Sequence, residues 1–443
     1  MKSTFRREFF RYVLPSMLAF ALSGIYSIAD GFFVGNELGD NALAAVNMAY
    51  PLTALIQAMG TGIGMGGAIM YTITANSSSP ENKKKYFGAS LILLGIFSVL
   101  LTVLVFFLSP YILKLFGAKG DIYTLGREYI RWIAVGTIFQ MLGTGLVPFL
   151  RNMGGSVSAM IAMIAGFVTN IFLDYLFVWV FSWGMTGAAI ATVIGQAVTF
   201  AVCLIYLIMK KLAPSLKLGK EAMHFLKKTF LLGLSPFGLT FSPNITLILI
   251  NRSAANFSQF AVTCYATVSY ISCVVLLLLQ GISDGSQPLM SKSYGEGDEA
   301  GAKRTRNFGF IVAFVTALVC LILLFFVRGQ TAKLFGASAE VGKEVADIMP
   351  IFTVGYLFAS ISRMVTAYFY ATEKTYRAYL LIYGEPIILL IFLLFMPSLW
   401  GITGTWVAVP ASQFVIMLLS ILLTYITDKK AKKAAPLPSQ HNG

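Results

Sequence analysis

The sequence predicts an all-α polytopic membrane protein with twelve transmembrane helices, arranged as two parallel six-helix repeats. Three observations predict this fold class. Apolar residues make up 57% of the 443 residues and charged residues only 12%, whereas soluble globular domains carry about 25% charged residues. Apolar runs of about 20 residues, long enough to span a bilayer, recur with short polar breaks. Short motifs of the first half return in the same order in the second half.

The duplication rests on three pairs of motifs. A Lys-Leu-Phe-Gly-Ala run, the glutamate of a Gly-x-Glu and a Trp-Gly-x-Thr-Gly run each occur twice, separated by about half of the chain. Three matches in register indicate two homologous halves. The pairs are 114–118 with 333–337, Glu128 with Glu344, and 183–187 with 400–404.

Each half contains six apolar spans. Their length and continuity favour helices over a membrane β-barrel, whose strands alternate in segments of about ten residues. Because six is an even number, both halves enter the membrane from the same side, as parallel repeats do. We expect an N-terminal lobe at 1–215 and a C-terminal lobe at 216–443. The predicted spans are 13–34, 43–74, 87–113, 128–150, 158–180 and 186–209, then 229–250, 259–290, 307–327, 346–371, 378–397 and 402–426.

The formal net charge of +14 comes from basic residues that are concentrated in particular loops. Lysine and arginine gather in alternate loops, for example at 83–85 and 210–228, while the loops at 181–185 and 398–401 have none. This is the positive-inside pattern, and it predicts that both termini are cytoplasmic. The linker at 210–228 is interpreted as a topology determinant and a contact for anionic lipids. Nucleic acid is not an expected partner.

The sequence shows no constellation for covalent catalysis, so an enzyme is not expected. Two isolated histidines, His224 and His441, cannot form a metal site. The glycines of 60–67 match a dinucleotide-binding pattern, but they lie in an apolar helix with no preceding strand, so the match is spurious. Small residues at this spacing instead indicate close helix packing. No cofactor is expected.

Ionisable residues inside the spans are costly in lipid and are therefore candidates for function. Asp30 and Asp174 lie at a similar depth near the outer ends of their spans, and Asn170 shares a helical face with Asp174. Two carboxylates in one site of low dielectric cannot both ionise cheaply, so one is protonated or the pair holds a cation. This predicts a site for H⁺ or Na⁺. The alternative is that each carboxylate accepts local hydrogen bonds near the headgroups.

Asp284, Arg363 and Glu385 form a candidate inner-side charge cluster. Each lies several residues from the inner end of its span. Arg363 and Glu385 belong to consecutive spans joined by a short turn, so they can pair. Such a pair is either a structural ion pair or an element of an inner gate that faces the transported compound.

Several of these motifs resemble the multidrug and toxic compound extrusion (MATE) family, in particular its bacterial drug-efflux branch. The resemblance is carried by Pro15, by Ile-Ala-Asp-Gly-Phe-Phe-Val-Gly at 28–35 and by Asn-Ile-Phe-Leu-Asp at 170–174, and it extends over nearly the whole chain. It implies a V-shaped pair of lobes, a cavity open alternately to each side, and antiport. It also implies that Asp30, Asn170 and Asp174 bind the cation and that the first helix bends near Pro15.

The chain departs from some family members in its seventh span. Residues 229–250 contain no acidic side chain. Coupling through a carboxylate on that helix is therefore not expected. The site formed by Asp30, Asn170 and Asp174 in the N-terminal lobe is the favoured coupling site.

The predicted function is an antiporter of the inner membrane. It exports amphipathic, cationic organic compounds in exchange for H⁺ or Na⁺, acts as a monomer and contacts membrane lipids. The sequence does not distinguish the two ions. A flippase for lipid-linked saccharides is the alternative, but its cavity needs cationic residues, and Arg363 is the only base expected to be buried. A non-transporting scaffold or receptor would not need carboxylates at matching depth.

Overall fold

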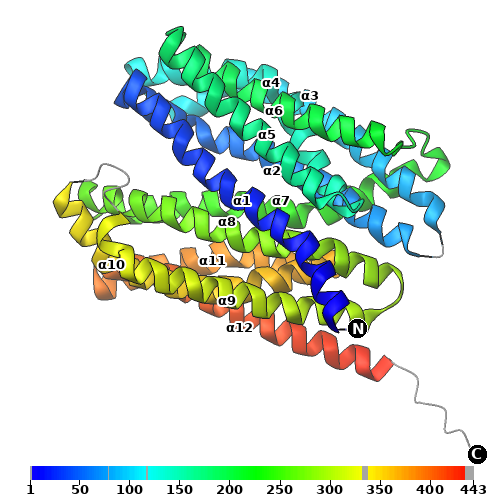
Figure 1. Ribbon diagram of the computed structural model, residues 1–443. Helices are drawn as coiled ribbons and strands as arrows, with labels where there is room; N and C mark the ends of the chain where they lie inside the picture. Colours follow the sequence, from blue (N-terminus) through cyan, green and yellow to red (C-terminus); the bar gives the residue numbers. More distant parts are fainter. Residues whose placement is uncertain (1, 78, 116–117, 332–337, 435–443) are drawn as a thin grey trace, which may run out of the picture.

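The computed structural model describes residues 2–77, 79–115, 118–331 and 338–434, without the side chains of 2–3, 27–32, 40 and 430–434. The described chain is almost entirely helical (Figure 1). Its α-helices are α1 (Lys2–Leu38), α2 (Asp40–Ala75), α3 (Lys83–Leu115), α4 (Gly120–Asn152), α5 (Ser156–Asp174), α6 (Gly184–Met209), α7 (Ala222–Ala255), α8 (Gln259–Gly295), α9 (Glu299–Thr331), α10 (Ala339–Ala371), α11 (Thr375–Trp400) and α12 (Ile402–Ala434).

The predicted fold class is confirmed. Twelve helices of the described chain are long and apolar enough to cross a membrane, by length and composition. Large apolar side chains such as Phe107, Phe326 and Leu394 remain exposed on the outside of the bundle. Contiguous apolar surface of this kind is unfavourable in water and is expected of a protein surrounded by lipid.

Several helices extend beyond the predicted spans. Helix α4 covers Gly120–Asn152 where the sequence predicted 128–150, and α9 covers Glu299–Thr331 where it predicted 307–327. Hydropathy detects only the apolar part of a helix, whereas backbone hydrogen bonding continues through polar turns beyond it. This difference matters at α4, whose last turn carries a buried arginine.

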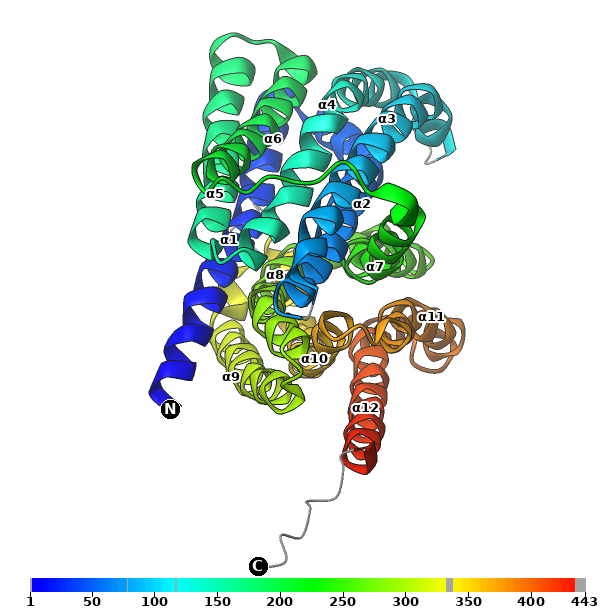
Figure 2. The same ribbon diagram turned by 90° about the vertical axis from the view of Figure 1, so that its right-hand side faces the viewer.

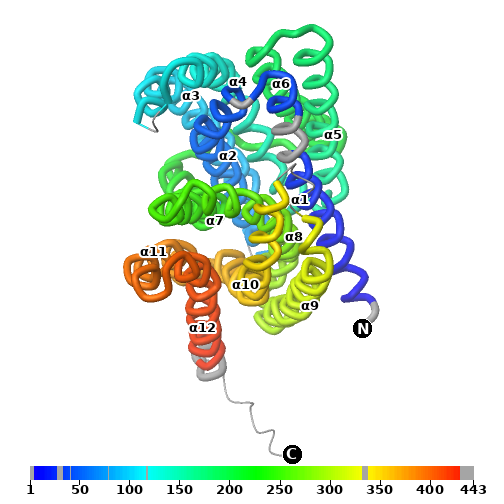
Figure 3. Tube along the Cα trace, turned by 90° about the vertical axis from the view of Figure 1, so that its left-hand side faces the viewer, coloured from blue at the N-terminus to red at the C-terminus, as the bar shows by residue number. Residues whose placement is uncertain are grey.

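The two repeats form two six-helix bundles, α1–α6 and α7–α12 (Figure 1). The first residues of α1 and the last residues of α12 lie at one end of the molecule, here named the termini end. Between the bundles, α1 packs on α8 and α2 packs on α7 (Figures 2 and 3). The exact boundary at residue 215 stays a prediction.

The buried apolar residues show where the lobes join. Toward the end opposite the termini, the core of each lobe is separate: one cluster includes Ala45 and Ile130, and another includes Cys264 and Phe352. Near the termini end, one cluster takes residues from both lobes, among them Met65, Phe225 and Tyr368. A further cluster joins Phe9 and Val13 of α1 to residues of the second lobe. The lobes are therefore closed against each other at the termini end by a shared apolar core.

Glycines of α2 allow the closest helix contacts, as the sequence predicted. A Cβ placed on Gly64 would lie 2.1 Å from the carbonyl oxygen of Gly145 in α4. A Cβ on Gly66 would lie 2.4 Å from the carbonyl oxygen of Thr229 in α7. Gly64 faces α4 of the first bundle and Gly66 faces α7 of the second bundle. Helix α2 therefore packs backbone to backbone against both bundles.

We expect Gly64→Ala to lower the free energy of unfolding by about 1–3 kcal/mol, the usual cost of overpacking, because the new methyl group meets backbone that cannot turn away. Gly95→Ala is the matched control, since nothing lies within 4 Å of a Cβ there. That variant should be neutral or slightly stabilising, because alanine favours helix over glycine. Thermal unfolding of the purified variants measures both effects. Equal midpoints for the two variants would contradict the packing argument.

Pro15 lies inside α1 where that helix is pressed against the second lobe. A Cβ on Gly281 of α8 would lie 2.7 Å from the Cα of Met17, and one on Gly285 would lie 2.7 Å from the Cα of Val13. The segment around Pro15 is therefore held by two glycines one helical turn apart. Proline removes a backbone donor and weakens the helix locally, which fits a hinge, although bending of α1 stays a prediction.

Candidate functional site

Asn170 and Asp174 lie on one face of α5 and are buried, with 2% and 0% of their surface exposed. The Asn170 amide orientation that satisfies its neighbours donates to Asp174 Oδ2 and to the Tyr26 hydroxyl, each at 3.1 Å. In this orientation the amide oxygen accepts from the Thr192 N–H at 3.0 Å. The predicted spacing thus brings the amide and the carboxylate into direct contact.

Helices α1, α5 and α6 supply this site. The ring of Tyr26 in α1 stacks on Phe167 in α5 with ring centroids 4.9 Å apart, which fixes the tyrosine hydroxyl toward Asn170. Asp30, the other predicted ligand, belongs to α1, but its side chain lies outside the part of the chain that the structure describes. Its role therefore stays a prediction.

The chain changes its helix type directly after Asp174. Residues Tyr175–Val180 form a π-helical segment, a rare geometry that occurs frequently at functional sites. Beyond it, the Glu128 carboxylate accepts from the Thr186 N–H at 3.1 Å and from the Thr186 hydroxyl at 2.6 Å. Two of the repeated motifs thus meet in the first lobe, where Glu128 caps the start of α6.

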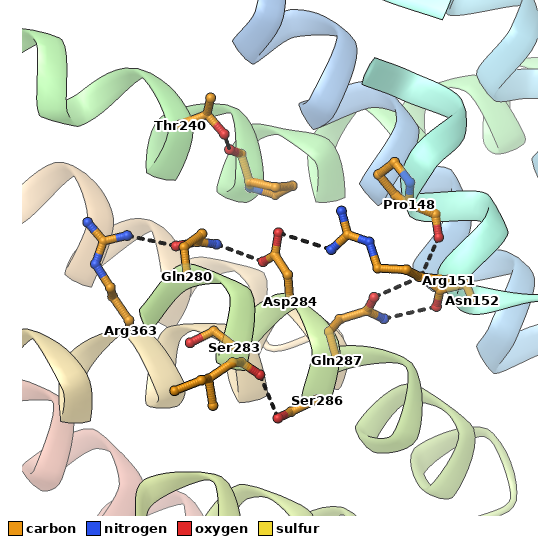
Figure 4. Close-up of polar contacts among 12 residues, drawn as sticks. Pro148, Arg151, Asn152, Thr240, Gln280, Ser283, Asp284, Ser286, Gln287 and Arg363 are labelled. Carbon is orange, nitrogen blue, oxygen red and sulfur yellow. Dashed lines mark hydrogen bonds and ion pairs between the residues drawn. The ribbon is translucent and has the colours of Figure 1, made fainter. Parts of the chain in front are cut away.

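The second site is centred on Asp284 of α8, which is almost fully buried. Its carboxylate accepts from the Gln280 amide at 2.7 Å and from the Tyr370 hydroxyl at 3.2 Å. Arg151 Nη1 of α4 lies 3.4 Å from Asp284 Oδ2 (Figure 4). The Arg151 guanidinium also lies over the ring of Phe20 in α1, 5.3 Å from its centroid. This ion pair joins the two lobes.

Arg363 reaches the same network from α10. Its Nη1 donates to the Gln280 side-chain oxygen at 2.7 Å, so Gln280 links Arg363 to Asp284 (Figure 4). Among the described residues, Arg363 and Glu385 make no ion pair within 4 Å. The pairing expected from their consecutive helices is therefore not formed here, because α8 supplies a nearer partner for the guanidinium.

Sequence reasoning missed Arg151, the base of this network that pairs with Asp284. Arg151 follows directly after the predicted span at 128–150 and was therefore not counted as a residue of the membrane interior. The expectation that Arg363 is the only buried base is wrong, since Arg151 and Arg306 are both almost fully buried. Arg306 is balanced by Asp428, whose Oδ2 lies 2.9 Å from Arg306 Nη2.

Amide contacts extend the connection between the lobes. Asn152 of α4 and Gln287 of α8 exchange two side-chain hydrogen bonds of 2.8 and 3.2 Å (Figure 4). Asn152 also accepts from the Thr72 hydroxyl at 2.7 Å, and Gln287 donates to Ser291 at 2.8 Å. Together with Arg151 and Asp284, these side chains form a polar latch across the interface near the termini end.

Within the residues that the structure describes, no group of three or more histidine, cysteine, aspartate or glutamate side chains could hold a metal ion. One carboxylate with a neighbouring amide and hydroxyl suits a weakly held, exchangeable cation.

A family of known proteins matches this chain twice, once in each of its two repeats. The MatE family model matches this chain at residues 15–176 and 241–396, which places one match in each lobe. The chain is 24% identical over 431 residues to a protein of Staphylococcus saprophyticus named "Multidrug export protein MepA", with 96% of this chain and 94% of the relative covered. A protein of the same name from Staphylococcus aureus is 24% identical over 435 residues, with the same coverage.

Solved structures share the fold. A structure titled "Outward-facing conformation of a multidrug resistance MATE family transporter of the MOP superfamily" aligns with a TM-score of 0.88 at 22% identity, covering 96% of each chain. A MOP superfamily transporter from Pyrococcus furiosus Vc1 aligns with a TM-score of 0.89 at 22% identity, again covering 96% of each chain. With family-model matches over more than half of its length, the chain belongs to the MatE family and is a membrane transporter rather than an enzyme.

Proposed function

We propose that this transporter is an antiporter that exports amphipathic, cationic organic compounds in exchange for H⁺ or Na⁺. The observation that carries the proposal is Asp174, which is fully buried in a membrane-spanning helix and contacts the Asn170 amide. A buried carboxylate in lipid is costly and needs either a proton or a cation. The names of the staphylococcal relatives, which are multidrug export proteins, support the assignment of the cargo.

The proposed mechanism is alternating access, in which the space between the lobes opens first at one end of the molecule and then at the other. At the termini end the lobes share an apolar core and the polar latch, whereas toward the opposite end their cores are separate. An incoming cation binds at Asp174 and Asn170, between α1, α5 and α6. Helix α1 also packs on α8 around Pro15. A shift of α1 on cation binding therefore alters the contact between the lobes and favours the opposite opening.

We propose that the termini end faces the cytoplasm and that the protein lies in the cytoplasmic membrane. The loops between α2 and α3 and between α6 and α7 lie on that side and carry the lysine clusters. The positive-inside rule assigns such loops to the cytoplasm. In this orientation the cation site lies toward the outer side, where H⁺ or Na⁺ enters.

A flippase for lipid-linked saccharides is the second candidate. Such a cavity needs unbalanced positive charge to match phosphates. The two bases that are buried in the described helices do not provide it, because Arg151 pairs with Asp284 and Arg306 pairs with Asp428. The half-buried Arg363 is bonded to Gln280, which in turn contacts the Asp284 carboxylate. Charge balance favours export of organic compounds over flipping of phosphates.

Transport under separately imposed ion gradients tests the proposal. Purified protein in liposomes loaded with a cationic dye should release the dye when either a proton or a sodium gradient is applied, and liposomes without protein should not. The gradient that drives release identifies the coupling ion. If neither gradient accelerates dye movement while a lipid-linked saccharide crosses the bilayer, the flippase is the correct function.

A further inference from the structure

A small cavity lies at the termini end of the first lobe, next to the polar latch and lined by none of the latch residues. It has a volume of about 110 Å³ and is lined by the last turns of α2, the start of α3, the turn before α5 and the linker between the lobes. This is well below the roughly 300–1,000 Å³ of pockets for drug-sized ligands. The cavity therefore suits a small chemical group. Its lining residues are Tyr71, Lys83, Lys84, Phe87, Met153, Lys211, Leu212 and Ala213.

The lining carries three positive charges and no carboxylate. Lys83, Lys84 and Lys211 surround the cavity, and none of them makes an ion pair with a described residue. Lys83 and Lys84 also begin α3, where the helix dipole adds partial positive charge. Like charges gathered around one cavity repel each other, so an anion that fills the cavity is favoured.

Lys211 occupies a backbone position that usually disfavours a side chain. Helix α6 ends in a Schellman motif, with the Leu212 N–H bonded to the Leu207 carbonyl at 2.9 Å and the Lys211 N–H bonded to the Ile208 carbonyl at 3.0 Å. Lys211 occupies the left-handed position of this motif, with φ of 54°. Glycine is the usual residue there because a side chain is strained in that conformation. A lysine at this position keeps an amino group at the cavity in spite of the strain.

The linker is fixed against α3 rather than free. The Ser215 N–H donates to the Lys84 carbonyl at 2.9 Å. Ser215 also approaches Gly88 so closely that a Cβ on that glycine would lie 1.9 Å from the Ser215 carbonyl oxygen. Figure 2 shows this linker running across the termini end of the first lobe toward α7. The backbone that carries the three lysines is therefore fixed around the cavity.

Apolar side chains beside the cavity identify the source of the anion. Ile208 and Met209, in the last turn of α6 just before Lys211, are largely exposed, as is Leu216 in the linker. Exposed apolar residues next to a basic cavity at the end of a membrane-spanning helix fit the boundary between acyl chains and headgroups. We infer that this cavity binds the phosphate of an anionic phospholipid. The inference is independent of the transported compound and of the coupling ion.

Lipid titration of the full-length protein tests the inference. Native mass spectrometry should show that the wild type binds phosphatidylglycerol more tightly than phosphatidylcholine. Lys211→Gly should bind phosphatidylglycerol about fivefold more weakly, the contribution of one lysine beside an anionic headgroup. Without lipid its thermal midpoint should equal or exceed that of the wild type, because glycine relieves the strain at φ of 54°. Loss of binding then cannot be attributed to misfolding.

A second pair of lysines in the same linker provides the matched control. Lys217→Gln/Lys220→Gln removes two exposed charges that do not line the cavity, and should change the affinity by no more than about twofold because salt screens them. If this control weakens binding as much as Lys211→Gly does, the attraction is diffuse and the cavity is not a specific site. If inorganic phosphate raises the thermal midpoint as much as phosphatidylglycerol does, the lipid assignment is wrong.

Discussion

Replacing Asp174 by asparagine is expected to reduce gradient-driven export to the level of protein-free liposomes. The substitution keeps the size of the side chain and most of its hydrogen-bonding capacity, but it removes the charge that a proton or a sodium ion requires. Interactions with a charged group contribute about 1.5–3 kcal/mol. Because about 1.4 kcal/mol corresponds to a factor of ten in affinity, the affinity for the cation should fall roughly tenfold to hundredfold. Asn170, whose amide contacts Asp174 Oδ2, remains to bond the new amide, so the protein should still fold.

The measurement is dye export from liposomes under the gradient that drives the wild type. Asp121→Asn is the control, since Asp121 is an exposed carboxylate of the same lobe and should be dispensable. Dye binding by the Asp174→Asn variant should persist, because the cargo and the cation bind separately. Active export close to the wild-type rate would remove Asp174 from the coupling mechanism. In that case Asp284 would become the leading candidate for coupling.

The architecture could be predicted from the sequence alone. Apolar runs predicted the helices, and the repeated motifs predicted the two bundles, because both signals are carried by residues close together along the chain. The contact of Asn170 with Asp174 was predictable for the same reason: residues four apart share a helical face. Whether these two residues and Asp30 bind the coupling cation stays a prediction that the transport experiment addresses.

The network around Asp284 could not be predicted in the same way. Arg151 and Asp284 are 133 residues apart and meet only because the last turn of α4 approaches α8 across the interface between the lobes. Hydropathy ended the fourth span one residue before Arg151, so the strongest candidate partner was discarded. Arg363 was expected to pair with Glu385 of the adjacent helix, but Gln280 of α8 lies closer. Contacts between helices that are remote in sequence are decided by lobe packing, which no local pattern encodes.

The polar latch leads to the second prediction. Arg151→Ala leaves the Asp284 carboxylate buried without its cationic partner, and breaking a buried pair in this way costs about 3–5 kcal/mol. The cost is avoided if the lobes separate at the termini end and admit water to Asp284. We therefore expect Arg151→Ala to shift the conformational equilibrium toward opening at that end. Arg151→Met/Asp284→Leu removes both charges and should restore much of the closed population.

Spin labels at Lys210 and Glu296, both exposed at the termini end and one in each lobe, can measure this opening in a cysteine-free background. Arg151→Ala should lengthen the distance between the labels, and the double variant should largely restore it.

Glu8→Gln is the matched control, because Glu8 pairs with Lys292 across the same interface. The side chains of Glu8 and Lys292 are 45% and 47% exposed, whereas those of Asp284 and Arg151 are 4% and 5% exposed. Exposed ion pairs contribute at most about 1 kcal/mol, so Glu8→Gln should leave the distance between the labels unchanged. If Arg151→Ala also leaves it unchanged, the shared apolar core alone closes the termini end, and the ion pair has no part in the switch between the two openings.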